Sequence, residues 1–263
     1  IAVPARPPDV NGRRFLADIA AMTRRNVLRI WRTPNIVLIT LMAPMVFVGL
    51  FDIVFGGSIT TGDLDYIDFL IPGVLVQTAV FDGTNTAIAL TQDLQRGSLD
   101  RFRSLPVRRS AVLIGRTTAD LLRLGVTSLV VLAAGFLLGF RPGEGPVALI
   151  GAMLLAIALG HTFHWAYTWL GLLLKDPVAV ESAGYMPILP LVFVASTFAP
   201  VDNMPGWLQP IAEHQPVTVT VDAVRALIHG GELASPLIQS ALWIVGLLAL
   251  WSTLATRSFD RLS

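Results

Sequence analysis

The chain has 263 residues, of which 54% are hydrophobic and 14% are charged, and its formal net charge is +1. Soluble domains carry about 25% charged residues, so the composition excludes an ordinary soluble protein and indicates an integral membrane protein. The sequence contains no cysteine. Disulfides, thiol catalysis and cysteine-ligated metal sites are therefore excluded.

The first 34 residues are expected to form a cytoplasmic arm. Between Arg13 and Trp31, apolar residues such as Phe15 alternate with arginines such as Arg24. An apolar face opposite a basic face is typical of a helix that lies in the headgroup plane of a membrane. We therefore predict an interfacial amphipathic helix in this arm, ended by Pro34.

Six long apolar segments follow the arm. A helix needs about 20 apolar residues to cross the hydrocarbon core of a bilayer. The segments that meet this length are residues 36–55, 66–90, 111–140, 147–174, 178–198 and 237–255. We predict an all-α membrane domain over residues 35–263, with six transmembrane helices.

The distribution of basic residues indicates the orientation of these spans. Of the 19 lysines and arginines, 17 fall in the arm, in residues 93–123, at Lys175 or in the C-terminal tail. Only Arg141 and Arg225 fall on the opposite side. Because basic loops next to membrane spans stay in the cytoplasm, we expect both termini on the cytoplasmic side.

The basic loop at residues 93–110 carries a short apolar stripe. Leu99, Phe102 and Leu105 recur at three-residue spacing, which predicts one face of a short helix, with Ser98 as its N-cap and Pro106 as its end. The stripe favours docking into a groove on another protein. The surrounding arginines would equally suit an anchor on anionic lipid headgroups, so the residues alone leave both interpretations open.

The longest segment outside the spans is residues 199–236. It contains a helical pattern at residues 217–228, which is too short to cross a bilayer core. Asp222 and Arg225 stand three residues apart and are costly in lipid unless they pair. We predict two short helices that dip into the outer leaflet or lie on it.

Polar residues mark two candidate faces for a transport pathway. Gln77, Phe81 and Asn85 recur at four-residue spacing on the second span, and Phe193 and Thr197 do so on the fifth. Polar groups on such faces turn toward protein or a hydrated cavity. The faces therefore suit either an amphipathic substrate or ordinary packing between helices, and the pattern leaves both open.

The sequence lacks the motifs of a nucleotide or metal site. Lys175 is followed by Asp176, so no phosphate-binding loop of the Gly-x-x-x-x-Gly-Lys-Ser/Thr type occurs. His161 and His164 are three residues apart without the His-Glu-x-x-His pattern of a zinc site. We therefore expect no catalytic residue, no bound metal and no cofactor on this chain.

Two motifs give the chain a family resemblance that covers nearly its whole length. One follows the second span and is Gln95-Arg96-Gly97-Ser98-Leu99-Asp100-Arg101, with Leu105-Pro106-Val107 and Arg116. The other is Phe198-Ala199-Pro200, Met204-Pro205, Trp207-Leu208, Gln215-Pro216-Val217 and Asp222-Ala223-Val224-Arg225, ending at Gly230. The chain resembles a permease subunit of a type-2 ABC exporter, of the daunorubicin-resistance-like branch, although the family often has an acidic residue where Gln95 stands.

The resemblance implies a fold role and a set of partners. It makes the arm an elbow helix, residues 94–109 a coupling helix, and residues 199–236 the outer helices. Separate ATPase subunits would bind ATP and Mg²⁺, and a second identical or homologous permease would face this one in a bacterial cell membrane. The substrates implied are drugs, lipids or glycolipids, with no role for nucleic acid. The coupling residues implied are Arg96, Leu99, Asp100, Arg101, Phe102 and Leu105.

Two other classes of protein compete with an exporter subunit. A secondary transporter or channel would use ionisable residues at mid-membrane, for which Asp82 is the nearest candidate. An intramembrane enzyme would explain the histidines and the polar second span, but no nucleophile–base spacing supports it. Copurification of an ATPase would separate these classes.

Overall fold

The computed structural model describes Thr23 and residues 34–62, 64–95 and 109–261, and across these residues the fold is entirely helical. The all-α class predicted from the sequence is therefore confirmed for this part of the chain. The predicted elbow helix and the predicted coupling residues 96–105 lie outside the described residues and stay predictions. The helices are α2 (Pro34–Phe55), α3 (Tyr66–Gln95), α5 (Arg109–Leu138), α6 (Pro146–Leu174), α7 (Pro177–Phe193), α8 (Gln209–His214), α9 (Pro216–His229) and α10 (Ala234–Arg261), with a 3-10 turn η1 (Val201–Asn203).

Four of the described helices are long and apolar enough to cross a membrane. They contain Tyr66–Gln95, Thr118–Leu138, Pro146–Leu174 and Ala234–Phe259, and they match the second, third, fourth and sixth predicted spans. The apolar parts of the other two candidates, Met42–Phe55 in α2 and Pro177–Phe193 in α7, are shorter. The chain is thus membrane-integral, and the six-span count stays a prediction.

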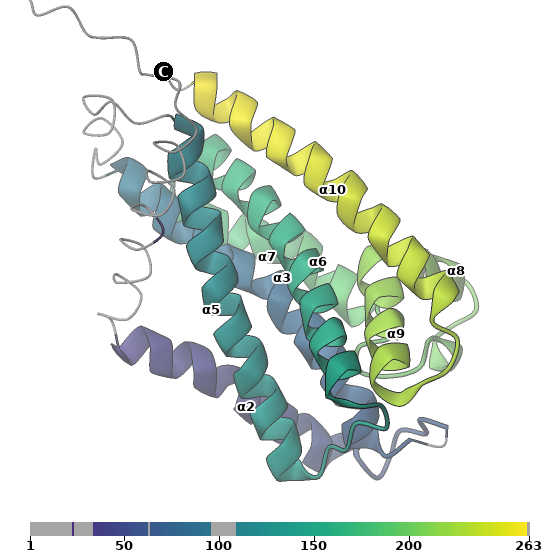
Figure 1. Cartoon of the computed structure of the whole chain (residues 1–263). Helices are drawn as coiled ribbons and strands as arrows, with labels where there is room; N and C mark the ends of the chain where they lie inside the picture. The colour runs from purple at the N-terminus through teal and green to yellow at the C-terminus, as the bar shows by residue number, and fades with distance from the viewer. Residues whose placement is uncertain (1–22, 24–33, 63, 96–108, 262–263) are drawn as a thin grey trace, which may run out of the picture.

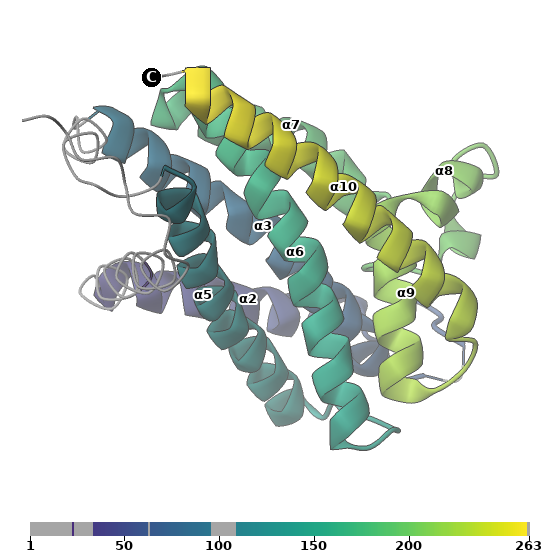
Figure 2. The ribbon, with the colours of Figure 1, turned by 45° about the horizontal axis from the view of Figure 1, so that its top comes forward.

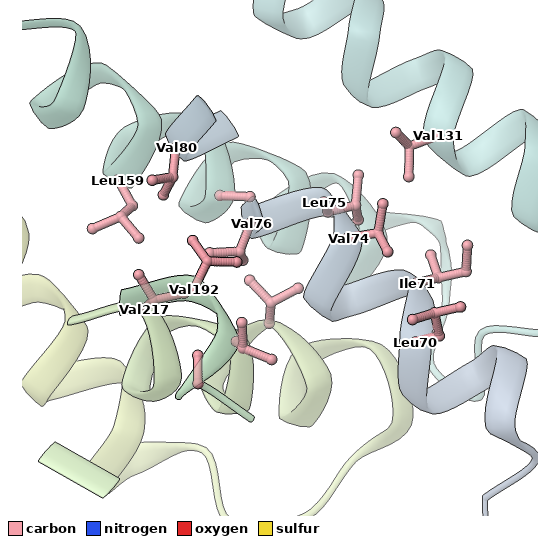
Figure 3. Packing of buried hydrophobic residues seen from close by; sticks show 14 of the residues in the cluster. Leu70, Ile71, Val74, Leu75, Val76, Val80, Val131, Leu159, Val192 and Val217 are labelled. Carbon is pink, nitrogen blue, oxygen red and sulfur yellow. The ribbon is translucent and has the colours of Figure 1, made fainter. Parts of the chain in front are cut away.

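Helix α3 is the centre of the fold. It packs against α2, α5, α6, α7 and α9, while α10 lies along α6 and α9 at the side (Figure 1). In both ribbon views α2 crosses behind α5 at a steep angle (Figures 1 and 2). Val76 of α3, Val192 of α7 and Val217 of α9 meet in the main apolar core (Figure 3). Because α3 is buried on most sides, its polar residues are held by neighbouring helices rather than by lipid.

A tyrosine wedged between two glycines fixes the register of α3, α6 and α7. The ring of Tyr167 in α6 lies against Gly83 in α3 and Gly184 in α7, and a Cβ added at either glycine would lie 2.5 Å from a ring carbon. The Tyr167 hydroxyl donates to the carbonyl oxygen of Gly184 at 3.4 Å. Only glycine allows both backbones to approach the ring this closely.

Helix α7 begins where the sequence predicts but ends earlier. Its first turn is capped by Asp176, whose carboxylate accepts from the amide of Ala179 at 2.9 Å, with Pro177 at the first helical position. The predicted fifth span ran to residue 198, and that boundary is wrong because α7 ends at Phe193. The backbone of Ser196 bonds to side chains of α9 instead of continuing the helix.

The two short helices predicted in residues 199–236 are present as α8 and α9. Helix α9 packs against α3, α6 and α10, and Val217, Val221, Val224 and Ile228 are fully buried. It is therefore enclosed by protein. The predicted alternative in which it lies on the leaflet surface is wrong, because its apolar face is covered by three helices.

Candidate functional site

An ionic cluster joins α3, α5 and α6 inside the membrane domain. The carboxylate oxygen Oδ2 of Asp82 lies 2.9 Å from Nη2 of Arg123 and 3.1 Å from Nε2 of His164. Arg123 also lies 3.4 Å from Asp120, and the hydroxyl of Thr86 donates to Asp120 at 2.8 Å. Three helices are thus tied together by one charged network.

The cluster carries a net charge of −1 while His164 is neutral, because two carboxylates face one guanidinium. Buried charges are tolerated only when they are paired and hydrogen-bonded, and the side chain of Asp82 is only 3% exposed. An ionised carboxylate accepts but does not donate, so Nε2 of His164 carries the hydrogen. Its Nδ1 finds no partner among the described residues. The ion pair with Arg123 accounts for the presence of Asp82 without a proton-carrier role.

Part of this cluster could be predicted and part could not. Asp120 and Arg123 stand at three-residue spacing, which puts both on one helix face, and the structure brings them into contact. The side chain of Arg116, expected on the same face, lies outside the described side chains. His164 was interpreted as an interfacial or packing residue, and its contact with Asp82 was missed because the two are 82 positions apart.

The polar face predicted on the second span is only partly accessible. Gln77 is buried, Phe81 is half-buried and Asn85 is exposed. The amide oxygen of Gln77 has no hydrogen-bond partner among the described residues. The ring of Phe81 lies 5.7 Å from that of Tyr185 in α7. The face therefore opens only toward the Gln95 end of α3.

The predicted pairing of Phe193 and Thr197 on one helical face is wrong. Helix α7 ends at Phe193, and Thr197 belongs to the turn that follows. Thr197 is fully buried against Gly73 of α3, whereas the side chain of Phe193 is 53% exposed. Of the two, only Phe193 is placed to meet a substrate from outside the described fold.

An aromatic group replaces the predicted face at this end of α7. Phe198 is its centre, with ring centroids 5.6 Å from Phe47, 4.7 Å from Phe51 and 5.2 Å from Phe193. Phe47 and Phe51 belong to α2, so the rings connect α2 to the end of α7. Stacked and tilted rings at these separations contribute packing energy beyond the area they bury.

Asp222 and Arg225, the pair predicted in α9, form an ion pair of 2.8 Å. Arg225 also donates to the carbonyl oxygens of Ser196 at 2.8 Å and Phe69 at 3.2 Å, and its guanidinium lies 3.8 Å from the centre of the Phe69 ring. Burial lowers the pKa of Arg225 to about 10, opposed by Asp222, so the side chain stays charged at neutral pH. The network holds α9 against the start of α3.

Comparison with known proteins identifies the family. A family model described as ABC-2 type transporter matches residues 17–229. The chain belongs to this family. The match of this ABC-2 type transporter runs from within the N-terminal arm to the last residue of α9 and leaves out α10. It therefore includes the charged cluster, the exposed end of α3 and the Asp222–Arg225 pair.

Curated relatives of this ABC-2 type transporter are permease proteins. It is 34% identical over 206 residues to the daunorubicin resistance ABC transporter permease protein DrrB1 of Streptomyces coeruleorubidus, covering 78% of this chain and 70% of that one. It is 30% identical over 237 residues to the probable doxorubicin resistance ABC transporter permease protein DrrC of Mycobacterium tuberculosis, covering 89% and 85%. The putative transport permease ycf38 of Pyropia yezoensis is 27% identical, covering 81% and 74%.

Proposed function

We propose that this chain is the membrane-spanning subunit of an ATP-driven exporter that moves amphipathic drugs or lipids out of the cytoplasm or the inner leaflet. The observation that carries the proposal is the family match over residues 17–229, together with relatives named as drug-resistance permeases. The chain itself would be no enzyme. ATP and Mg²⁺ would bind to a separate ATPase subunit.

The proposed topology has six spans in a bacterial cell membrane. Helices α2 and α7 supply the two spans beyond the four long helices; at 1.5 Å per residue, the 22 residues of α2 extend about 33 Å and the 17 of α7 about 26 Å. The 17 basic residues on one side place both termini and residues 93–110 in the cytoplasm. Residues 199–236 then lie at the outer face.

Coupling would act through the loop between α3 and α5. Leu99, Phe102 and Leu105 would enter a groove on the ATPase, with Arg96, Asp100 and Arg101 at its rim. Helix α3 leads into this loop and α5 leads out of it. Because the Asp82 and Arg123 ion pair ties the two helices together, a push on the loop moves both as a unit. Only a ligand that distinguishes inward from outward states can drive the switch.

The substrate pathway would follow the outward side of α3 and α7, between this chain and a second permease. Phe81, Asn85 and Phe193 present accessible aromatic and amide groups there. Gln77 and Thr197, the other predicted pathway residues, are buried and would act only if the helices separate during transport.

Copurification tests the proposal. The tagged chain, extracted from bacterial membranes in mild detergent, should retain an ATPase that carries a phosphate-binding loop. Phe102→Asp should release that ATPase while leaving the amount of inserted permease unchanged. Ser104→Asp adds the same charge off the apolar stripe and is the matched control. Equal retention of the ATPase by Phe102→Asp would contradict docking through this loop.

A further inference from the structure

An unpaired carboxylate stands on the outward side of α7. Glu181 is exposed, one turn beyond the start of the helix, and forms no ion pair with any residue of the described chain. The other exposed side chains of this helix include Val178, Met186, Leu189 and Phe193, which are apolar. A charged residue in an apolar membrane helix is costly and rare, and it marks a site for a ligand or ion.

Two aromatic rings lie one turn farther along the same side. Tyr185 follows Glu181 by four residues, so both project from one face of α7. Its side chain is 37% exposed, and its ring is tilted against Phe81 of α3 with centroids 5.7 Å apart. The partly accessible ring pair offers an aromatic surface directly beside the carboxylate.

The packing of α3 against α7 places an amide at the level of the carboxylate. The two helices run antiparallel, because Gly73 contacts Thr197 whereas Gly83 and Gly184 both contact Tyr167. With Phe81 opposite Tyr185, the next inward turn brings Asn85 opposite Glu181. Asn85 is exposed although its neighbours Thr84 and Thr86 are buried. The surface therefore has an aromatic level and, one turn inward, a polar level.

The charge of this surface selects for a cation. No cation of the described residues neutralises Glu181, and the buried cluster behind α3 adds a further net charge of −1 because Arg123 serves both Asp82 and Asp120. A negative potential beside aromatic faces attracts a cation that also carries apolar area. Neither an anionic nor a wholly apolar ligand would gain from the carboxylate.

We propose that Glu181, Asn85, Phe81 and Tyr185 form a subsite that binds the cationic group of an amphipathic substrate. The carboxylate of Glu181 compensates the positive charge, and the two rings hold the apolar body. This inference rests on the proposed export function and names the class of substrate as amphipathic cations. The subsite lies near the cytoplasmic end of α7, where a substrate from the inner leaflet would enter first.

Equilibrium binding to the purified chain in phosphatidylcholine nanodiscs tests the subsite without ATP or an ATPase. The probes are tetraphenylphosphonium and tetraphenylborate, which match in size and differ in the sign of charge. Wild type should bind tetraphenylphosphonium saturably. Glu181→Gln should weaken that binding about tenfold, and Tyr185→Leu should also weaken it. Glu213→Gln, which neutralises an exposed glutamate of α8, should leave it unchanged.

The outcomes separate this inference from the proposed function. Absence of saturable tetraphenylphosphonium binding to wild type, or equal affinity in Glu181→Gln, would overturn the subsite. Equal affinity would mean that a lipid headgroup or a second copy of the chain covers the glutamate. Equal weakening by Glu213→Gln would reduce the effect to net charge and would also overturn it. Failure of ATP-driven export with intact cation binding would contradict the export function and not the subsite.

Discussion

The carboxylate of Asp82 lies 2.9 Å from the guanidinium of Arg123, across the packed interface of α3 and α5. This ion pair connects the two helices that enclose the cytoplasmic loop, and His164 fastens α6 to the same carboxylate. A displacement of the loop would therefore be passed to three helices together. The pair is the structural basis for rigid coupling in the proposed transport cycle.

Removing the cation of this pair should destabilise the fold. Arg123→Leu leaves Asp82 and Asp120 buried without a counter-charge, and breaking a buried pair in this way costs about 3 to 5 kcal/mol. The double variant Asp82→Asn/Arg123→Leu should recover part of the loss. Thermal unfolding in detergent measures both, with the exposed Arg257 changed to leucine as the control. Equal destabilisation by the single and double variants would show that the ion pair is unimportant.

The wedge at Tyr167 should make Gly184 intolerant of any side chain. A Cβ at this position would lie 2.5 Å from the Tyr167 ring, and overpacking of this kind costs about 1 to 3 kcal/mol. Gly184→Ala should lower the unfolding temperature, and Tyr167→Leu in the same chain should relieve part of the loss. Gly246→Ala in α10, where nothing lies within 4 Å, is the matched control. A Gly184→Ala protein as stable as wild type would rule out the wedge.

The end of α9 should become less stable in acid. Burial lowers the pKa of His229 below its usual 6.5; the proximity of Asp68 and the hydrogen bond to its carbonyl oxygen oppose this effect, and Arg225 reinforces it. The folded state therefore disfavours the protonated imidazole. Its contribution to stability is fully present above pH 6.5 and decreases as the pH falls below that value. Unfolding temperatures between pH 5 and pH 8 should fall more steeply for wild type than for His229→Gln. Parallel profiles would contradict the assignment.

Cysteine substitution should separate the accessible pathway residues from the buried ones, since the chain has no cysteine of its own. Asn85→Cys and Phe193→Cys should react with a polar thiol reagent, because both positions are exposed. Gln77→Cys and Thr197→Cys should react slowly or not at all in the resting state. Substrate or trapped nucleotide should change the reactivity at positions 85 and 193. Unreactive cysteines there in every state would exclude a pathway on this face.

The sequence predicts the helices well where local chemistry marks their ends. Helix α6 was expected at residues 147–174 and is found at Pro146–Leu174, because a proline begins it and Lys175 ends it in the left-handed conformation. The end of α7 was missed because residues 194–198 are as apolar as a span. Apolarity alone does not reveal that the backbone of Ser196 bonds to α9.

The candidate site was predictable only where its residues share one helix. Spacing placed Asp120 beside Arg123 and Asp222 beside Arg225, and both contacts are present. The pairing of Asp82 with His164, like that of Phe81 with Tyr185, joins helices that are distant in the sequence. No periodicity within one helix carries such information, because the contacts depend on how α3 packs against α6 and α7.

Transport in sealed vesicles tests the central claim most directly. The chain should be reconstituted with its copurified ATPase, and accumulation of an amphipathic fluorescent drug should be followed with ATP and Mg²⁺ outside. We predict uptake that requires ATP, and that stops when the phosphate-binding lysine of the ATPase is replaced. Uptake by the permease alone, driven by a proton gradient without ATP, would contradict the account.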